Sequence, residues 1–455
     1  MSRPAGFWTL ERVAAALAGE LTGARPAGSE PLARIVTDTR SLAAGDCFVA
    51  LQGERFDGHD FLSQAVAAGA AAVVVSRPER AAGLGVPVFA VRDTLRALGE
   101  LARFRRAAWG GPVIGIGGAN GKTTTKALLA AALGAVLEVH ATEGNHNNLV
   151  GVPQTLLALP DHTDVAVIEM GMNVPGEMAR LREIAAPDVA LVTGVGEEHL
   201  EGLGSLEGVL REESAIFDGA AIAITPATQP EIAAAARGRA RRVVQAGLEA
   251  GDVKAVRWSL DAGGLGTIEF EGTTVRPPAR GAHNLRNAML AIAAARECGV
   301  AAADAARGIA GAVMPEMRVA WGPLGKATLI NDAYNANPPS MRAAIDLLAG
   351  TAGRQRVAVL GGMRELGAHT ARLHDEIARY ALASPVELIA GIGEMGDALR
   401  AAGGAAARVV TGRDVDDLWP ALAPRLAGDA IILLKASRGV KLERLLPHLT
   451  AWSVR

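Results

Sequence analysis

A glycine-rich segment at residues 111–133, GPVIGIGGANGKTTTKALLAAAL, constrains the fold of this chain more than any other feature. An apolar run from Pro112 to Ile116 precedes the glycines, and Gly121-Lys122-Thr123 opens an alanine- and leucine-rich stretch typical of a helix. A strand, a glycine-rich turn and a helix in this order direct backbone N–H groups and a helix N-terminus toward an anion. We therefore predict an α/β domain with a phosphate-binding loop.

The loop has the residue types that a nucleotide polyphosphate requires. Lys122 would reach the outer phosphates, and the Thr123 hydroxyl would help to hold Mg²⁺. The other nucleotide contacts that we expect in the loop are Gly118, Asn120, Gly121 and Thr124. The spacing is a variant, because Ile116 stands where the strict pattern has glycine. An ordinary glycine-rich turn is the alternative; we predict that the loop binds ATP or GTP.

Length and composition exclude several classes of protein. A chain of 455 residues is expected to form roughly two to four domains. A net charge of −2 argues against bulk nucleic-acid binding, which needs a basic face. No apolar run approaches the roughly 18 residues of a membrane span, and the first residues lack the apolar region of a signal peptide. The two cysteines, Cys47 and Cys298, are too few for a disulfide framework. We expect a cytoplasmic protein.

Apolar strand-like runs and helical patterns alternate along the chain in three blocks. Such alternation indicates α/β domains with mostly parallel sheets. Residues 256–274 are the exception, because their pattern is typical of a hairpin. The third block, which begins near Met314-Pro315, fits a compact doubly wound domain. We predict domains at residues 1–85, 86–313 and 314–455.

Polar residues follow the apolar strands downstream of the loop, where ligands bind in open α/β sheets. The run 164–169 ends in Glu169, as a metal-holding acidic strand end does. His199 follows an apolar run and a glycine turn, and is either structural or a ligand beside Mg²⁺. The asparagines Asn145, Asn147 and Asn148 either shape a turn or contact a polar substrate through their amides.

Seven motifs occur in one order: GANGKTTTK, TEGNHNNLVGVP, VIEMGMNVPGEM, EEHLEGLGS, GAHNLRNA, NDAYNANPPSM and LLKASRG. That order closely resembles the Mur ligases, the ATP-dependent amide-forming enzymes of peptidoglycan synthesis. The motif DAYNANP in the third block and TDTRSLAAGDCFVALQGERFDGHDF in the first look most like the branch that adds D-alanyl-D-alanine to the UDP-muramoyl-tripeptide. The resemblance covers nearly the whole chain.

The resemblance implies a three-domain enzyme. A small α/β N-terminal domain would bind the UDP end of the substrate, a central P-loop domain with a mostly parallel sheet would bind ATP, and a Rossmann-like C-terminal domain would bind the incoming dipeptide. In such ligases the substrate carboxylate attacks the γ-phosphate to give an acyl phosphate. The free amine then attacks the acyl carbon, and phosphate leaves. The UDP end would lie around Thr39, Arg40, Asp57, Gly58 and His59.

The same resemblance assigns roles around the loop. Mg²⁺ would lie between Thr123, the phosphates and Glu169, and His199 would bind a second metal ion. Two anions must approach in line, so Lys122 would neutralise the transferred phosphoryl group. The catalytic set that we expect is therefore Lys122, Glu169 and His199.

Other roles implied by the resemblance lie farther along the chain. Asn287 would contact adenine, and Arg318 and Asp332 would contact the phosphates and ribose on domain closure. From residue type alone, Arg318 would be a surface ion pair and Asp332 a loop cap. Asn335 and Asn337 are expected to shape the turn before Pro338. Lys435 and Arg438 end a strand, where they either face the acyl phosphate or pair with Glu443.

Glu213 marks a departure from the family pattern. Many members carry a carbamylated lysine at this position, and its added carboxylate helps to hold the second Mg²⁺. Glutamate already carries a carboxylate, so we hypothesise that Glu213 replaces the carbamate as a metal ligand and makes activity independent of dissolved CO₂. A solvated helix charge is the alternative. A second departure is Gly362 with Arg364, where the arginine would either meet the dipeptide carboxylate or be an exposed loop charge.

The resemblance implies an ATP-dependent ligase with ATP and Mg²⁺ as cofactors and small-molecule substrates, acting as a monomer without nucleic acid or membrane insertion. A related ligase that adds a single amino acid is the alternative within the family. A P-loop phosphotransferase and a non-catalytic sugar-nucleotide sensor are alternatives from other classes. The third residue of the acceptor peptide stays open.

Overall fold

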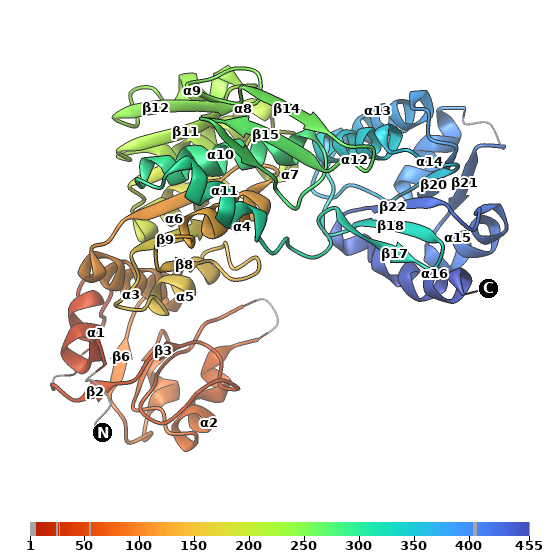
Figure 1. Ribbon diagram of the computed structural model, residues 1–455. Helices are drawn as coiled ribbons and strands as arrows, with labels where there is room; N and C mark the ends of the chain where they lie inside the picture. The colour runs from red at the N-terminus through yellow and green to blue at the C-terminus, as the bar shows by residue number, and fades with distance from the viewer. Residues whose placement is uncertain (1–5, 24–25, 27, 54–55, 404–406, 455) are drawn as a thin grey trace. The chain divides into compact units, whose positions relative to one another are not determined.

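The structure, a computed structural model, describes residues 6–23, 26, 28–53, 56–403 and 407–454 (Figure 1). Glu54 and Arg55 of the motif in the first block lie outside the described residues. Helices alternate with mostly parallel strands, which confirms the predicted α/β class. In the described part of the chain, no helix combines the length and the apolar character needed to cross a membrane.

The chain forms two compact units. The first comprises residues 1–115, 140–170 and 179–187, and the second comprises residues 116–139, 171–178 and 188–455. A four-stranded sheet belongs to the first unit and a six-stranded sheet to the second.

The four-stranded sheet has the order β3-β4-β5-β6, and all neighbouring pairs are parallel. Its strands are β3 (Ile35–Val36), β4 (Cys47–Val49), β5 (Ala72–Val75) and β6 (Val88–Ala90). Every residue of β4 and β5 is buried, as expected for a parallel sheet covered on both faces. β6 lies beyond residue 85, where the first domain was expected to end, and it pairs with β5.

Short elements accompany this sheet: α1 (Leu10–Ala16), η1 (Gly58–Phe61), α2 (Leu62–Ala67), η2 (Pro78–Ala81) and α3 (Thr94–Trp109). Oγ1 of Thr9 accepts a hydrogen bond from the backbone N–H of Arg12 at 3.2 Å and thereby caps α1. The strands β1 (Trp8–Thr9) and β2 (Pro31–Leu32) form an antiparallel pair. Helix α1 is therefore fixed at its start by a cap and by the strand that precedes it.

The seven-stranded sheet has the order β13-β12-β11-β10-β7-β9-β8, so β7 lies between β10 and β9. Its strands are β7 (Val113–Gly117), β8 (Val139–Ala141), β9 (Val165–Glu169), β10 (Val189–Val192), β11 (Ile222–Pro226), β12 (Arg242–Gly247) and β13 (Val253–Lys254). β7, β9 and β10 are buried along their whole length. The strands predicted from these three apolar runs are confirmed.

Helix α4 (Lys122–Leu133) follows the loop after β7 and packs against α10 (Ala282–Glu297) and α11 (Ala302–Ala310). The other helices of this part are α5 (Gly151–Leu157), α6 (Glu177–Ala185), α7 (Leu200–Leu203), α8 (Leu206–Glu213), η3 (Ser214–Phe217) and α9 (Pro230–Ala236). The predicted hairpin pattern is confirmed as an antiparallel sheet of β14 (Arg257–Leu260), β15 (Gly266–Phe270) and β16 (Thr273–Val275).

The six-stranded sheet has the order β17-β18-β22-β19-β20-β21, and only β17 is antiparallel to its neighbour. Its strands are β17 (Ala320–Leu324), β18 (Ala327–Asp332), β19 (Arg356–Leu360), β20 (Leu388–Ile392), β21 (Val409–Gly412) and β22 (Ile431–Lys435). After moving outward to β21, the chain returns to place β22 between β18 and β19. This order confirms the predicted doubly wound arrangement.

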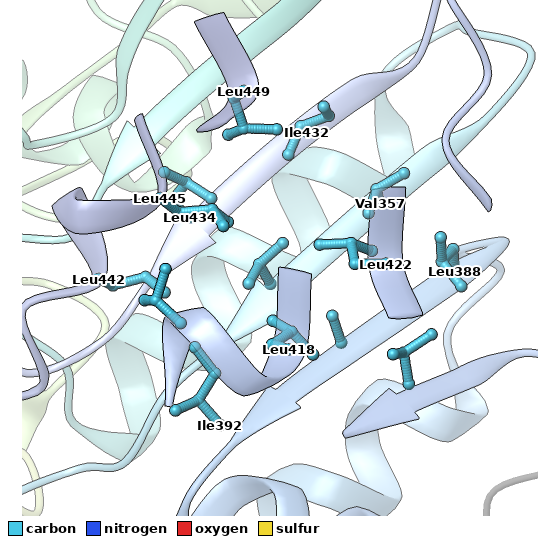
Figure 2. Close-up of a cluster of buried hydrophobic side chains, with 14 of the residues drawn as sticks. Val357, Leu388, Ile392, Leu418, Leu422, Ile432, Leu434, Leu442, Leu445 and Leu449 are labelled. Atoms are coloured by element: carbon cyan, nitrogen blue, oxygen red, sulfur yellow. The ribbon is translucent and has the colours of Figure 1, made fainter. Parts of the chain in front are cut away.

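Helices cover this sheet: α12 (Pro338–Gly350), η4 (Gly367–His369), α13 (Thr370–Ala383), α14 (Glu394–Ala401), α15 (Val415–Leu422), η5 (Ala423–Arg425), η6 (Arg438–Val440), η7 (Leu442–Arg444) and α16 (Leu445–Ser453). Helix α13 packs against α12 and α14, and α15 packs against α16. Side chains of α15 and α16, among them Leu418 and Leu449, meet the strand residues Val357 and Ile432 in a buried apolar core (Figure 2). This core supports the strand ends at which Lys435 and Asp332 lie.

Candidate active site

The phosphate loop is held against the end of β10. The backbone N–H of Ala119 donates to the carbonyl of Gly194 at 2.7 Å, and Oγ1 of Thr193 donates to the carbonyl of Asn120 at 2.6 Å. Gly121 has a φ of 85°, a left-handed conformation that glycine adopts at no steric cost, and helix α4 begins at the next residue. The predicted sequence of strand, glycine turn and helix is therefore confirmed, with the helix N-terminus open to an anion.

Lys122 and Thr123 occupy the first turn of α4. Nζ of Lys122 contacts the carbonyl oxygen of Gly118, four residues earlier in the loop. The side chains of Thr123 and Thr124 are both buried. Because a helix N-terminus carries partial positive charge, the lysine and the helix together provide a strongly electropositive position at the loop.

Asn287 packs against the loop from α10. It is buried, its Nδ2 donates to Oδ1 of Asn284 at 3.1 Å, and its Oδ1 would lie 2.5 Å from a Cβ placed on Gly121. The amide therefore touches the residue that precedes α4. Asn287, which was predicted to bind adenine, therefore lies next to the phosphate loop.

Glu213 is a buried part of the same loop environment. Its side chain comes from the last residue of α8, is 1% exposed, and accepts a hydrogen bond through Oε2 from the backbone N–H of Gly118 at 2.8 Å. Burial raises the pKa of Glu213 to about 7, although the positive charge of Lys122 acts in the opposite direction. The alternative interpretation as a solvated helix charge is wrong.

His199 precedes α7 with a φ of 51° and lies between two carboxylates. Its Nδ1 contacts the carboxylate of Glu365, and its Nε2 lies 3.9 Å from Oε2 of Glu198. Burial lowers the pKa of His199, but Glu365 and Glu198 outweigh that effect, so the pKa is raised. Oε1 of Glu198 is buried and has no hydrogen-bond partner among the described residues. His199 and Glu198 therefore form a polar cluster next to the turn that follows β10.

Glu169 lies in the first unit at the end of β9 and is completely buried. Its Oε1 accepts a hydrogen bond from Nδ2 of Asn147 at 2.9 Å, and its backbone N–H donates to Oγ1 of Thr142 at 3.0 Å. Oδ1 of Asn148 accepts from the backbone N–H of Gly151 at 2.9 Å and so helps to start α5. Asn145 is exposed. The three asparagines thus have separate positions: one contacts the acidic strand end, one shapes a turn and one faces solvent.

Lys435 and Asp332 form a buried pair in the C-terminal sheet. Nζ of Lys435 lies 2.8 Å from Oδ2 of Asp332 and donates to the carbonyl of Asn335 at 2.7 Å. The sequence offered Glu443 as the pairing partner of Lys435, and the structure corrects this to Asp332. Arg438 instead lies near Glu443, at 3.5 Å.

Two further residues of the C-terminal part have local contacts. The guanidinium carbon of Arg318 lies 4.2 Å from the centroid of the Tyr334 ring, which is a cation–π contact. Among the described residues, this contact takes the place of the surface ion pair that residue type alone suggested. Asn337 caps α12, because its Oδ1 accepts from the backbone N–H of Ser340 at 3.1 Å. The predicted turn-shaping role of Asn337 is confirmed.

The residues predicted to bind the UDP end are partly engaged with their own neighbours. Nδ1 of His59 lies 2.6 Å from Oδ1 of Asp57, and its Nε2 accepts from the backbone N–H of Ser76 at 3.0 Å. Arg40 is exposed and pairs with Asp38, which lowers the pKa of Asp38 to about 2. A Cβ on Gly58 would lie 2.8 Å from the backbone of Leu51, and Thr39 is half-buried. His59 is therefore a structural residue in this conformation, whereas Arg40 is open to a ligand.

The donor atoms fit a magnesium–nucleotide complex better than a metal site made of protein alone. No group of three or more His, Cys, Asp or Glu side chains among the described residues is arranged to hold a metal ion. Mg²⁺ bound with a nucleotide takes most of its oxygen ligands from phosphate and water and only one or two from the protein. In the second unit, Thr123 and Glu213 supply oxygen donors of that kind, whereas His199 offers a nitrogen donor.

Sequence reasoning missed Thr193 and Glu365. Thr193 follows β10 directly and holds the loop, and its place at the end of an apolar strand was a usable signal. Glu365 reaches His199 across 166 positions of sequence, and no local pattern indicates that contact.

Comparisons with known families identify relatives along most of the chain. The models of the Mur ligase middle domain, the Mur ligase glutamate ligase domain and the Mur ligase family catalytic domain match residues 116–295, 317–438 and 32–106. A UDP-N-acetylmuramoyl-tripeptide–D-alanyl-D-alanine ligase of Bacillus subtilis strain 168 is 37% identical over 425 residues, which are 91% of this chain and 92% of the relative. The Escherichia coli K12 protein of the same name is 37% identical over 412 residues, or 87% and 88%.

Solved structures show the same architecture. A crystal structure of MurF from Acinetobacter baumannii superposes with a TM-score of 0.90 at 31% identity and covers 98% of this chain and 99% of its own. MurF ligase from Thermotoga maritima in complex with ADP superposes with a TM-score of 0.82 at 28% identity and covers 92% and 98%. The three-domain architecture implied by the motifs is confirmed.

Proposed function

Because the chain belongs to the Mur ligase family, we propose that it joins D-alanyl-D-alanine to UDP-N-acetylmuramoyl-tripeptide with conversion of ATP to ADP and phosphate. The observation that carries this proposal is the 37% identity to the Bacillus subtilis ligase of that name over 91% of this chain. The loop supports it, because Lys122 lies at an open helix N-terminus, where a triphosphate binds.

In the proposed reaction a carboxylate attacks a phosphoryl group, so two anions must approach each other. Lys122 would leave the carbonyl of Gly118 and neutralise charge on the transferred phosphoryl group, and the N-terminus of α4 would hold the adjacent phosphates. Mg²⁺, when bound with ATP, supplies further positive charge between the phosphates. Within the second unit, Thr123 would hold one ion, and His199 and Glu213 a second.

The other assigned residues divide into two groups by their contacts. Asn120, Gly121, Thr124 and Asn287 lie at the loop or touch it, which supports a role in nucleotide binding. Arg318 would contact the nucleotide after it leaves Tyr334. The buried contact between Asp332 and Lys435 supports a structural role for both, in preference to contact with the ribose or the acyl phosphate.

We assign the substrates to domains at residues 1–85, 86–313 and 314–455, with β6 as an extension of the first. The exposed Arg40 is the best-placed residue of the N-terminal set for the UDP phosphates. Arg438 is exposed at the start of η6, near Glu443, and would bind an anionic substrate after leaving that carboxylate. We place the reaction in the cytoplasm, where ATP is available, and expect a monomer.

Phosphate release tests the proposal when it is measured with the complete substrate mixture, with each substrate omitted in turn, and with the alternative acceptors named below. Release should require ATP, UDP-N-acetylmuramoyl-tripeptide and D-alanyl-D-alanine together, and should be lost in Lys122→Ala. Release with a hydroxyl acceptor in place of the dipeptide would indicate a phosphotransferase. Binding of the UDP-sugar without ADP release would indicate a sensor. Release with a single amino acid and a shorter acceptor would indicate the related ligase.

A further inference from the structure

We propose that Glu213 is a positioning residue, which fixes the shape of the phosphate loop through its hydrogen bond with Gly118. The 2.8 Å bond joins the last residue of α8 to a loop 95 positions earlier in the sequence. This inference deepens the proposed function, and it rests on that function only in taking the loop as the ATP site.

The carboxylate lies directly against bare backbone. A Cβ placed on Gly117 would lie 2.6 Å from Oε2 of Glu213, and Gly118 has a φ of 117°, which side-chain-bearing residues rarely adopt. Both glycines are therefore needed for the carboxylate to reach the backbone N–H. The two glycines and the buried Glu213 therefore depend on each other: the carboxylate fits against the loop because Gly117 and Gly118 carry no side chains.

Gly118 is held from both of its sides. Its N–H donates to Glu213, and its carbonyl accepts from Lys122. Because this N–H donates to Glu213, it is not one of the groups that would bind a phosphate. When a nucleotide draws Lys122 away, the bond to Glu213 still holds Gly118 in place.

The burial of this carboxylate is consistent with a role other than stability. Glu213 is 1% exposed, and the loss of hydration on burial is the strongest effect that disfavours its ionised form, so its pKa is raised. A buried ionisable group of this kind costs free energy unless it is well bonded, and such groups concentrate at functional sites. Among the described residues, the carboxylate of Glu213 makes one hydrogen bond, which it accepts from the backbone N–H of Gly118.

ADP binding in EDTA, without any divalent metal, tests the loop role separately from metal coordination. Glu213→Gln keeps an oxygen acceptor for Gly118, whereas Glu213→Ala removes it. We expect Glu213→Gln to bind ADP within about 3-fold of the unmodified protein and Glu213→Ala to bind at least about 10-fold more weakly than Glu213→Gln, as expected for a lost hydrogen bond to a loop. Equal affinity of the two variants in EDTA would overturn the proposal.

Two more variants keep the result interpretable. Glu207→Gln removes an exposed carboxylate from the same helix and should leave ADP affinity unchanged. If Glu213→Ala does not fold, Glu213→Asp keeps the charge on a shorter stem that cannot reach Gly118, and it should bind ADP as weakly as expected for alanine. ADP affinity in Glu213→Asp equal to that of the unmodified protein would also overturn the proposal.

The ligase reaction provides a second measurement. With saturating Mg²⁺, Glu213→Asp should raise the KM for ATP about 10-fold above that of Glu213→Gln, because only the glutamine keeps an acceptor for Gly118. A change in kcat alone, at constant KM, would contradict a loop-positioning role. If the unmodified protein binds ADP but never releases phosphate, the proposed function fails while the loop inference stands.

Discussion

Nζ of Lys435 lies 2.8 Å from Oδ2 of Asp332, and the two residues are direct neighbours across the parallel strands β22 and β18. Both side chains are nearly excluded from solvent, with exposed fractions of 4% and 11%. Oδ1 of Asp332 also accepts from the backbone N–H of Val319 at 3.1 Å. The pair therefore ties the start of the C-terminal sheet to its central strand.

Replacing only one member of this pair should be costly. Lys435→Met leaves the Asp332 carboxylate buried without its partner, which we expect to lower the free energy of unfolding by about 3 kcal/mol. The double variant Lys435→Met with Asp332→Asn should recover most of that loss. Urea unfolding of the three proteins measures this. A stable Lys435→Met that loses ligase activity would instead place Lys435 at the acyl phosphate.

Glu213 should make stability depend on pH. Its pKa is about 7 in the folded protein and about 4.5 in the unfolded chain, so between these values the folded state holds a proton that the unfolded state releases. Its contribution to stability is therefore fully present below pH 4.5 and is lost as the pH rises to about 7. Glu213→Gln does not titrate and should gain up to about 3 kcal/mol relative to the unmodified protein over that window.

Denaturation midpoints of both proteins at pH 5, 6, 7 and 8, measured in EDTA, test this. The difference in midpoint should grow from pH 5 to 7 and then level off. A constant difference across the series would show that the carboxylate keeps an ordinary pKa in the folded protein.

The sequence predicted the strands of the central and C-terminal sheets well, because their apolar runs are buried on both faces. It missed β8, β12, β13 and β17. β8 and β13 are only three and two residues long, β12 begins with Arg242, and β17 contains Gly322 and Pro323, which weaken the apolar pattern. Of the two roles weighed for Lys435, the pairing with Glu443 was wrong. The register that sets Lys435 beside Asp332 depends on β22 inserting between β18 and β19, and no local pattern encodes that pairing.

The same limit applies to the candidate site. The residues of the phosphate loop could be predicted because the order and spacing of its glycines, Lys122 and Thr123 are themselves typical of phosphate binding. Glu213 was singled out only through the family pattern, and its contact with Gly118 depends on how α8 packs. The contact of Glu365 with His199 joins separate parts of the sequence and needed the structure.

Bicarbonate should not affect the unmodified protein, because Glu213 carries its carboxylate without modification. Glu213→Lys should lose activity in CO₂-depleted buffer, since it places a cation near Lys122 and removes the acceptor for Gly118. Added bicarbonate should restore part of that activity, because a lysine amine adds CO₂, loses a proton and becomes a carbamate. Glu213→Arg, which cannot be modified in this way, is the control. Strong bicarbonate activation of the unmodified protein would contradict the hypothesis that Glu213 replaces a carbamate.

Gly121→Ala should damage the loop in two ways. The new methyl group would lie 2.5 Å from Oδ1 of Asn287, and the backbone would have to keep a φ of 85°, which costs an alanine about 1–2 kcal/mol. We expect ADP affinity to fall at least about 10-fold, since 1.4 kcal/mol of lost loop energy already has that effect.

Gly219→Ala is a matched control, because Gly219 has a φ of 79° and nothing lies within 4 Å of its Cβ position. It should lose a similar backbone energy in urea unfolding and keep its ADP affinity. If both variants lost the same ADP affinity, the effect would come from general destabilisation and the close packing of Asn287 on the loop would have no part in nucleotide binding.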